Sequence, residues 1–425
     1  MSPKLKHWRW RIFSITWLAY AGFYLTRKGF SAVKSILKEQ LGVSKGQLAV
    51  VDTAYNVAYA FGMMGFGVLG DRLGTRKVIL AGMGISILAG IAMGFSHTML
   101  LFGVLMTVQG LVQSTGWGPL ARNLSQFFGT KERGLVMGLW CTNYSLGGVI
   151  ATTIAGTAAE KFGWQAAFWI PALLLLVIWV LFLLFQRDKP EDVGLPAIGE
   201  APPTEAMENA LREEGEVTPV ASSWTDVQAV IKNPMVQLLC GVYFAIKPIR
   251  YLFLLWGPLY IHERLGTGVA ESALISVTFE VGGPIGALLG GWISDKLLGA
   301  RRMPVCVVSL IMVALCLALF GFLPANKFAI GGVLAVMGAF LYAADSLVTG
   351  TAAVDFGTRK GAATAAGVIN GSGSFGQIIG GFLPGLIGDK PADWNPLFWG
   401  LSVGVVIAAL ALAPKWNAMP KGATD

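Results

Sequence analysis

Runs of about 20 mostly apolar residues recur along the whole chain and leave little length for any other kind of domain. A helix of that length crosses the hydrocarbon core of a bilayer, which is roughly 30 Å thick. Hydrophobic residues fill 54% of the 425 positions and charged residues only 13%. Ordinary soluble domains carry about twice that share of charge. The sequence therefore predicts an all-α membrane protein.

The apolar runs predict twelve transmembrane helices, six on either side of a polar segment. The expected spans are 12–32, 49–70, 78–96, 98–120, 135–158 and 165–186, then 234–260, 270–293, 303–323, 328–350, 361–385 and 394–414. The first run follows a basic start but is too long for the core of a signal peptide, so we expect it to remain as an anchor.

The polar segment between the sixth and seventh runs has mostly acidic charged residues and contains several prolines, which is typical of a solvated linker. We expect a six-helix bundle over 1–186, a cytoplasmic linker over 187–232 and a second six-helix bundle over 233–425. The two halves also share a sequence motif at corresponding positions. "GVLGDRLGTRK" follows the second run and "GGWISDKLLGARR" follows the eighth, which places Asp71 and Asp295 224 positions apart. Two such repeats predict a substrate site at their interface.

Charge predicts the orientation and excludes one class of partner. With both termini in the cytoplasm, the short inner segments collect most of the Lys and Arg, as the positive-inside rule requires. The net charge of +8 is spread over loop ends beside the membrane, so we expect anionic lipid headgroups and not nucleic acid as its partners. The four cysteines fall within expected spans without the spacing of a metal site, so we expect free thiols and no metal.

Two arginines, Arg27 and Arg250, lie inside expected spans and are 223 positions apart. An arginine near the bilayer centre costs about 2.5–3.5 kcal/mol on the insertion scale, so such a residue usually faces a cavity or a partner. The repeat predicts that these two face each other. Each guanidinium can donate two hydrogen bonds to a tetrahedral dianion, so a phosphate monoester fits the pair better than a carboxylate does. We expect Lys28, next to Arg27, to extend outward.

The alternative is that the buried cations pair with buried acids. Lys247 is three residues before Arg250 and shares its helix face, so it is a further candidate for binding the substrate. The sequence also offers two acids inside spans, Glu280 in the eighth and Asp345 in the tenth. Asp345 can neutralise Lys247 and leave the two arginines as the net charge. Glu280 is either a counterion that substrate releases or a fixed structural partner.

The pattern at residues 67–77 resembles the loop signature of the major facilitator superfamily: Gly, then Asp-Arg, Gly and Arg-Lys. Asp295 lies in the corresponding motif of the second half. The resemblance implies a gating loop, in which Asp71 caps a helix end while Arg72, Arg76 and Lys77 pair with carboxylates or lipid phosphate. Plain positive-inside topology is the other interpretation of these basic residues.

Further motifs resemble one branch of that superfamily, the organophosphate:inorganic phosphate antiporters. They are "YLTRKGF", "GWGPLARN", "KERG", "LWCTNYSLGG", "RDKPEDVGLP" and "RYLFLLWGPLY". The resemblance implies that two bundles rock around a central pair of arginines, and Arg27 and Arg250 match those positions. "WRWRIFSITWLAYAGFYLTRK" and "GLPAIGE" are also similar to the branch's hexose-phosphate sensors, which act with a histidine kinase. Tyr144 and Met63 depart from the histidine and lysine of many relatives.

Four polar residues near these motifs are candidates for contact with the organic part of a ligand: Tyr24, Asn143, Tyr144 and Tyr251. Tyrosine can stack on a sugar ring or hydrogen-bond to it. Tyr144 does not titrate near neutral pH, so no protonation role carries over from the histidine. The stretch "GSGSFG" at 371–376 and "GGPIGALLGG" after Glu280 predict close helix packing, not a dinucleotide site.

Three functions remain open from the sequence. The first is an exchanger in the inner (plasma) membrane that takes a sugar phosphate or glycerol phosphate in return for inorganic phosphate. The second is a sensor of the same ligand that acts with a kinase, and the third is an exporter with Asp345 or Glu280 as proton carrier. No phosphate-binding loop is present and the linker is too short for an ATPase, so we expect neither an enzyme nor a cofactor. We expect a monomer.

Overall fold

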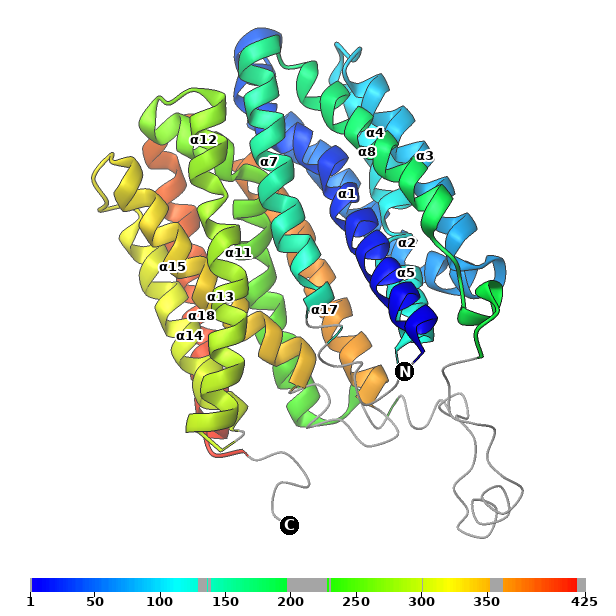
Figure 1. Ribbon diagram of the computed structural model, residues 1–425. Coiled ribbons are helices and arrows are strands. Elements are labelled where there is room, and N and C mark those ends of the chain that lie inside the picture. Colours follow the sequence, from blue (N-terminus) through cyan, green and yellow to red (C-terminus); the bar gives the residue numbers. More distant parts are fainter. Residues whose placement is uncertain are drawn as a thin grey trace.

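The computed structural model describes residues 2–128, 136, 139–196, 228, 231–299, 301–351 and 362–418, and every regular element in this part of the chain is a helix (Figure 1). The helices of the first half are α1 (Pro3–Leu41), α2 (Lys45–Leu73), α3 (Thr75–Met93), α4 (Met99–Gln113), α5 (Trp117–Phe127), α7 (Thr142–Phe162) and α8 (Ala166–Phe185). Those of the second half are α11 (Pro234–Leu265), α12 (Val269–Ser276), α13 (Thr278–Trp292), α14 (Arg302–Leu319), α15 (Lys327–Ser346), α17 (Ala362–Phe382) and α18 (Trp394–Leu412).

Shorter helical turns join or extend these helices. They are η1 (Pro190–Val193), η2 (Ile293–Leu297), η3 (Leu347–Thr351), η4 (Leu383–Leu386), η5 (Pro391–Asp393) and η6 (Ala413–Lys415). Each of the twelve expected spans overlaps one helix or two consecutive helices. The fourth span is α4 followed by α5, and the eighth is α12 followed by α13. The all-α membrane architecture is confirmed, and most of the expected linker lies outside the described residues.

Local signals in the sequence set the ends of the two longest helices. The side chain of Ser2 caps the start of α1, and that of Asn233 caps the start of α11, in each case just before a proline at the first helical position. Both helices end at a glycine in the left-handed region, Gly42 with φ 63° and Gly266 with φ 65°. A residue with a Cβ is strained there, so these glycines allow each chain to leave its helix sharply.

Eight helices of the described part are long and apolar enough to cross a membrane. The other spanning positions are held by α1, α2, α7 and α17, whose sequences contain charged, hydroxyl or small residues. These four helices contact the opposite half: α1 packs against α11, α2 against α17, and α7 against α12 and α13. Their polar content is therefore shielded from lipid by protein, which is where a membrane protein tolerates it.

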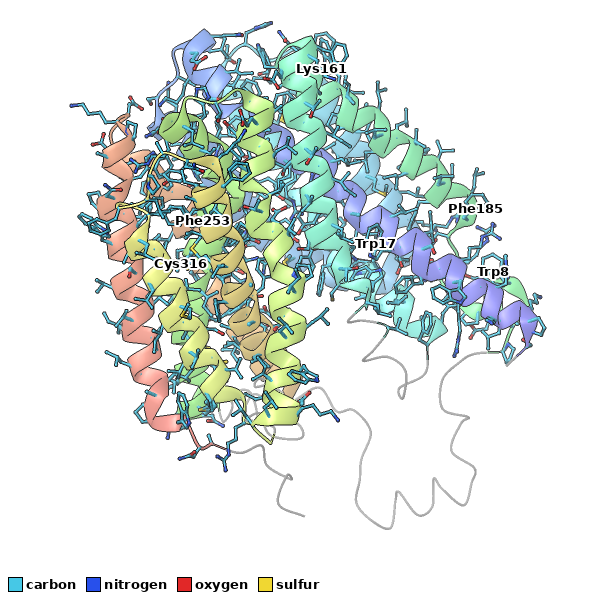
Figure 2. The ribbon with its side chains drawn as sticks, turned by 60° about the vertical axis from the view of Figure 1, so that its left-hand side comes forward. Trp8, Trp17, Lys161, Phe185, Phe253 and Cys316 are labelled. Carbon is cyan, nitrogen blue, oxygen red and sulfur yellow. The ribbon has the colours of Figure 1, made fainter. Side chains whose placement is uncertain are left out.

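The two halves lie side by side, with α7 and α11 near the boundary between them (Figure 1). Helix α1 begins and α18 ends at the same end of the molecule (Figure 1). Figure 2 shows Trp8 and Phe185 near that end and Lys161 near the opposite one. The guanidinium of Arg11 lies over both rings, 4.6 Å from that of Trp8 and 4.5 Å from that of Phe185.

Glycine-rich stretches bring helices into backbone contact, as the sequence predicts. A Cβ on Gly286 of α13 would lie 1.8 Å from the carbonyl oxygen of Ala339 on α15, so no larger residue fits there. The "GSGSFG" stretch lies on α17, where a Cβ on Gly376 would lie 2.6 Å from the carbonyl oxygen of Phe244 on α11. Both stretches therefore act as packing surfaces.

Polar contacts hold the two halves together at one end, which we call the closed end: it contains the C-terminus of α1 and the N-terminus of α2. Among the described residues, the hydrogen bonds and ion pairs between the halves lie in the middle of the molecule or toward this end. They join Lys28 to Leu254 and Glu280, Ser31 to Leu254 and Leu255, Lys34 to Leu255, Lys38 to Glu263 and Asp389, Glu39 to His262, Lys45 to Glu263 and Gly388, Asn56 to Gln377, and Ser145 to Glu280.

Candidate substrate-binding site

Arg27 lies on α1 with its guanidinium among aromatic rings. The guanidinium carbon is 4.5 Å from the ring centroid of Tyr24, 5.1 Å from that of Tyr59 and 5.7 Å from that of Tyr55. Its Nε donates to the amide oxygen of Gln113 at 3.0 Å, whereas its Nη2 is buried and has no partner. Within the described residues Arg27 forms no ion pair with a carboxylate, so its charge is balanced only by dipoles and π faces.

Gln113, on α4, has its orientation fixed by a network of its own. Its Oε1 accepts from Arg27 and from the hydroxyl of Tyr55, each at 3.0 Å. Its Nε2 donates to Oγ1 of Thr26 at 3.0 Å and to the amide oxygen of Gln109 at 2.7 Å. With the amide saturated in this way, the arginine is held in one place before any ligand arrives.

Arg250 lies on α11 and shares one carboxylate with a neighbour. Its Nη1 is 3.1 Å from one oxygen of Asp345 on α15, and the ammonium of Lys247 is 3.4 Å from the other. The guanidinium carbon is also 4.4 Å from the ring centroid of Tyr342 and 5.4 Å from that of Tyr144. Two cations face one anion here, and the Nε of Arg250 is buried without a partner.

Lys28 does not extend outward, and that expectation from the sequence is wrong. Its ammonium is buried and donates to the carboxylate of Glu280 on α13 at 2.6 Å and to the carbonyl of Leu254 on α11 at 3.2 Å. An acid of the other half lies close enough to bind the ammonium inside the protein. Glu280 is thus a structural partner of Lys28 in this conformation, not of either arginine.

The charges at the centre leave a surplus. If all groups are ionised, four cations face two carboxylates, and the region carries a formal charge of +2. The cations are Arg27, Lys28, Lys247 and Arg250, and the carboxylates are Glu280 and Asp345. The surplus comes from both halves, because Arg27 lacks an acid and Arg250 shares one with Lys247. A dianion bound between the halves would cancel it.

The sequence indicated four further polar residues, and the structure places them in different surroundings from one another. Tyr24 lies beside Arg27, Tyr144 lies near Arg250, and Tyr251 is half-buried with the ammonium of Lys247 5.8 Å from its ring centroid. Asn143 is fully buried on α7, and neither atom of its amide has a partner.

The expected gating residues are only partly placed. Arg76, at the start of α3, donates from its side chain to the carbonyls of Gln186 and Leu183 at the end of α8, and from its backbone N–H to the carboxylate of Asp188. Its pairing with a lipid stays a prediction. The backbone of α8 ends there with free carbonyls, which a cation satisfies. Lys77 is exposed, and Asp295 pairs with Arg302. The side chains of Asp71 and Arg72 lie outside the described residues, although both positions belong to α2.

Sequence reasoning missed Gln113, Tyr59 and Tyr342, which contact the two arginines. For two of them, the spacing in the sequence indicated the position. Tyr59 is four residues after Tyr55 and so shares its helix face, and Tyr342 is three residues before Asp345. The fixed orientation of Gln113 comes from contacts between different helices, which a linear pattern does not contain.

Comparisons with known proteins agree with this arrangement. Residues 16–370 match the family described as Major Facilitator Superfamily. The chain is 30% identical to a "Probable hexose phosphate transport protein" of Chlamydia trachomatis, over 98% of this chain and 93% of that protein. It is 29% identical to a "Glycerol-3-phosphate transporter" of Bacillus subtilis (98% and 94%) and 28% identical to the "Membrane sensor protein UhpC" of Escherichia coli (98% and 94%).

Solved structures show the same fold. A bacterial homologue of the human lysosomal transporter Spinster superposes with a TM-score of 0.72 at 15% identity, over 98% of this chain and 96% of that one. The nucleoside transporter NupG superposes with a TM-score of 0.70, over 96% and 98%. The helices and the sequence matches lead to one assignment. The chain belongs to the major facilitator superfamily and, within it, to the organophosphate:inorganic phosphate antiporter family.

Proposed function

We propose that this protein exchanges a phosphorylated metabolite, a sugar phosphate or a glycerol phosphate, for inorganic phosphate by alternating access. The observation that carries the proposal is the surplus of positive charge at the centre. Arg27 and Arg250 each keep a buried guanidinium nitrogen without a partner. Unpaired buried donors are costly, and phosphate oxygens are strong acceptors that would satisfy one donor from each half.

The contacts at the closed end support the second part of the proposal. Alternating access requires that the halves separate at one end while they meet at the other. Here they meet at the closed end, through α1 with α11 and α2 with α17. Phosphate between Arg27 and Arg250 reduces their mutual repulsion and so favours the approach of the halves, whereas an empty site resists it. Such coupling makes transport an obligatory exchange.

In the proposed orientation the protein spans the inner (plasma) membrane with both termini in the cytoplasm, because the basic segments lie on that side. The closed end then faces outward, and the conformation described gives access from the inside. The two moving bodies are residues 1–186 and 233–425, joined by the linker over 187–232. Membrane lipids are further partners, and we propose that a monomer carries out the cycle.

The test is exchange by purified protein in vesicles loaded with inorganic phosphate. External sugar phosphate or glycerol phosphate should release the internal phosphate. Arg27→Lys and Arg250→Lys should each impair exchange, because lysine cannot donate two parallel hydrogen bonds. Arg187→Lys is the matched control, because Arg187 donates to backbone carbonyls one and three residues away. Full exchange in both test variants would overturn the proposal.

A sensor is the second candidate, favoured by the near full-length similarity to the membrane sensor protein. A sensor binds the same ligand, and it acts through a histidine kinase instead of through flux. Ligand would then raise the melting temperature of the purified protein, as it would for a transporter, but vesicles would show little exchange. The vesicle experiment therefore separates the two functions.

A further inference from the structure

Pro258 leaves one backbone acceptor open in the last third of α11. A proline has no N–H, so the carbonyl of Leu254, four residues earlier, cannot receive its usual helical hydrogen bond. Side chains of α1 take that place. The carbonyl of Leu254 accepts from Lys28 and from Ser31, each at 3.2 Å, and that of Leu255 accepts from Ser31 at 2.7 Å. The two halves thus meet along a row of carbonyls.

Lys34, further along α1, also donates to one of these carbonyls, and it forms an ion pair with a buried acid. Its ammonium donates to the carbonyl of Leu255 at 2.8 Å and lies 3.7 Å from the ring centroid of Trp256. It also forms a short ion pair with Asp52 of α2. The side chains are 0% and 1% exposed, so the pair is sealed from solvent in this conformation. It lies outside the group of charges assigned to phosphate.

One oxygen of the Asp52 carboxylate has no hydrogen-bond partner and can bind a proton. Its Oδ2 faces Lys34, but its Oδ1 is buried and has no hydrogen-bond partner. One turn along α2, Asn56 accepts from Gln377 of α17 at 2.8 Å and keeps a buried nitrogen without a partner. A buried, half-satisfied carboxylate is costly as an anion, and a proton on Oδ1 removes the cost of that unpartnered oxygen. The ammonium of Lys34 then relies on the carbonyl of Leu255 and the ring of Trp256.

The pair is placed where its surroundings change during transport. Lys28, six residues earlier on α1, acts on Lys34 electrostatically from the centre. Toward the closed end lie the charges of Lys38, Lys45 and Glu263. Helices α11 and α17 contribute the ring of Trp256, backbone carbonyls and the amide of Gln377, but no charged side chain to this layer among the contacts described.

We propose that Lys34 and Asp52 form a proton-binding site whose affinity changes as the halves part. A proton from solvent bonds to Oδ1 of Asp52 and gives a neutral acid, while Lys34 stays an ammonium held by Leu255 and Trp256. When the closed end opens, Lys34 loses both of these partners and depends on the Asp52 carboxylate, which releases its proton. The site goes beyond the proposed function, because phosphate exchange does not require it.

Infrared spectroscopy of the purified protein tests the site without any transport. Lowering the pH should produce the carbonyl band of a buried, protonated carboxylic acid in the wild type. Asp52→Asn should lose that band, and Asp52→Glu should restore it. Asp389→Asn is the control, because Asp389 is an exposed carboxylate at the closed end and its removal should leave the band unchanged. The same pH-dependent band in Asp52→Asn would overturn the proposal.

A second variant keeps the test valid if Asp52→Asn does not fold. Lys34→Met with Asp52→Leu replaces the ion pair by apolar residues of similar volume, which buried pairs often tolerate. Phosphate self-exchange at equal pH on both sides should then lose the part of its pH dependence that comes from the protein and keep the part that comes from phosphate. A wild-type pH profile in this double variant would contradict the site. Absent exchange in the wild type would instead contradict the proposed function.

Discussion

Lys28 and Glu280 are 252 residues apart in the chain, yet a hydrogen bond of 2.6 Å joins them across the centre of the molecule. The residue before Lys28 has no such partner. Successive residues of a helix point about 100° apart. Lys28 therefore reaches the second half, whereas Arg27 points to α4 and to tyrosines of α1 and α2 in its own half. Two neighbouring cations therefore differ in their surroundings: Lys28 is paired with an acid, whereas Arg27 forms no ion pair with a carboxylate among the described residues.

Replacing Glu280 by Gln should destabilise the protein, because the ammonium of Lys28 then stays buried without a counterion. Breaking a buried pair in this way costs about 3–5 kcal/mol. Thermal unfolding in detergent measures the loss. The double variant Lys28→Met with Glu280→Gln should recover much of it, because no unpaired charge remains. A single variant as stable as the double variant would show that the pair contributes little.

Gly148→Ala should disturb the same pair from α7. A Cβ at Gly148 would lie 2.3 Å from Oε2 of Glu280, so the carboxylate must move away from Lys28. Overpacking of this kind costs roughly 1–3 kcal/mol, and phosphate exchange should slow. The control is Gly400→Ala on α18, where a Cβ meets nothing within 4 Å. Equal stability and exchange of the two alanine variants would contradict the arrangement.

Asp345→Asn should change stability and phosphate binding in opposite directions. Without the carboxylate, Lys247 and Arg250 repel each other in a buried place, so the melting temperature without ligand should fall. Inorganic phosphate should then raise the melting temperature more than it does in the wild type, because the site has gained one positive charge. Asp295→Asn, in η2 just after α13, serves as the control. A smaller phosphate-induced shift in Asp345→Asn would argue against an anion between the arginines.

The sequence was sufficient for the helices because a membrane span needs a long apolar run, and the chain shows twelve of them. The sequence also offered the pairing of Lys247 with Asp345 as one alternative, because an acid inside one span can neutralise a cation inside another. Both inferences rest on periodicity and on cost, which are local properties. The structure adds that Asp345 serves the lysine and the arginine together.

Contacts between distant helices could not be predicted in this way. That Lys28 would meet Glu280 depends on how α1 packs against α13, and several acids were equally available in the sequence. The carbonyl freed by Pro258 gave a signal, because a proline inside a span leaves an acceptor open. Nothing in the chain said that Lys28 and Ser31 of the other half would bond to it.

The closed end depends on one buried acid more than on its exposed neighbour. The carboxylate of Glu263 lies 2.7 Å from the ammonium of Lys38 and 2.8 Å from that of Lys45. It also accepts a hydrogen bond from the indole N–H of Trp394 at 2.8 Å. Asp389 also receives Lys38, at 2.6 Å, but its side chain is 72% exposed. An exposed pair contributes at most about 1 kcal/mol, whereas removal of a buried partner leaves charges uncompensated.

Glu263→Gln should therefore open the closed end, whereas Asp389→Asn should leave it nearly unchanged. The distance between spin labels at Gln40 and Ala392, on opposite halves, measures the opening after the four native cysteines are replaced. The hydrogen bond from Lys38 holds the pKa of Asp389 below its usual range. A lowered pKa adds stability that is complete above about pH 4 and disappears as the pH falls through the folded-state value. At neutral pH this contribution is fully present but small, because Asp389 is exposed, so the label distance should change little in Asp389→Asn. A larger opening in Asp389→Asn than in Glu263→Gln would reverse the order of importance.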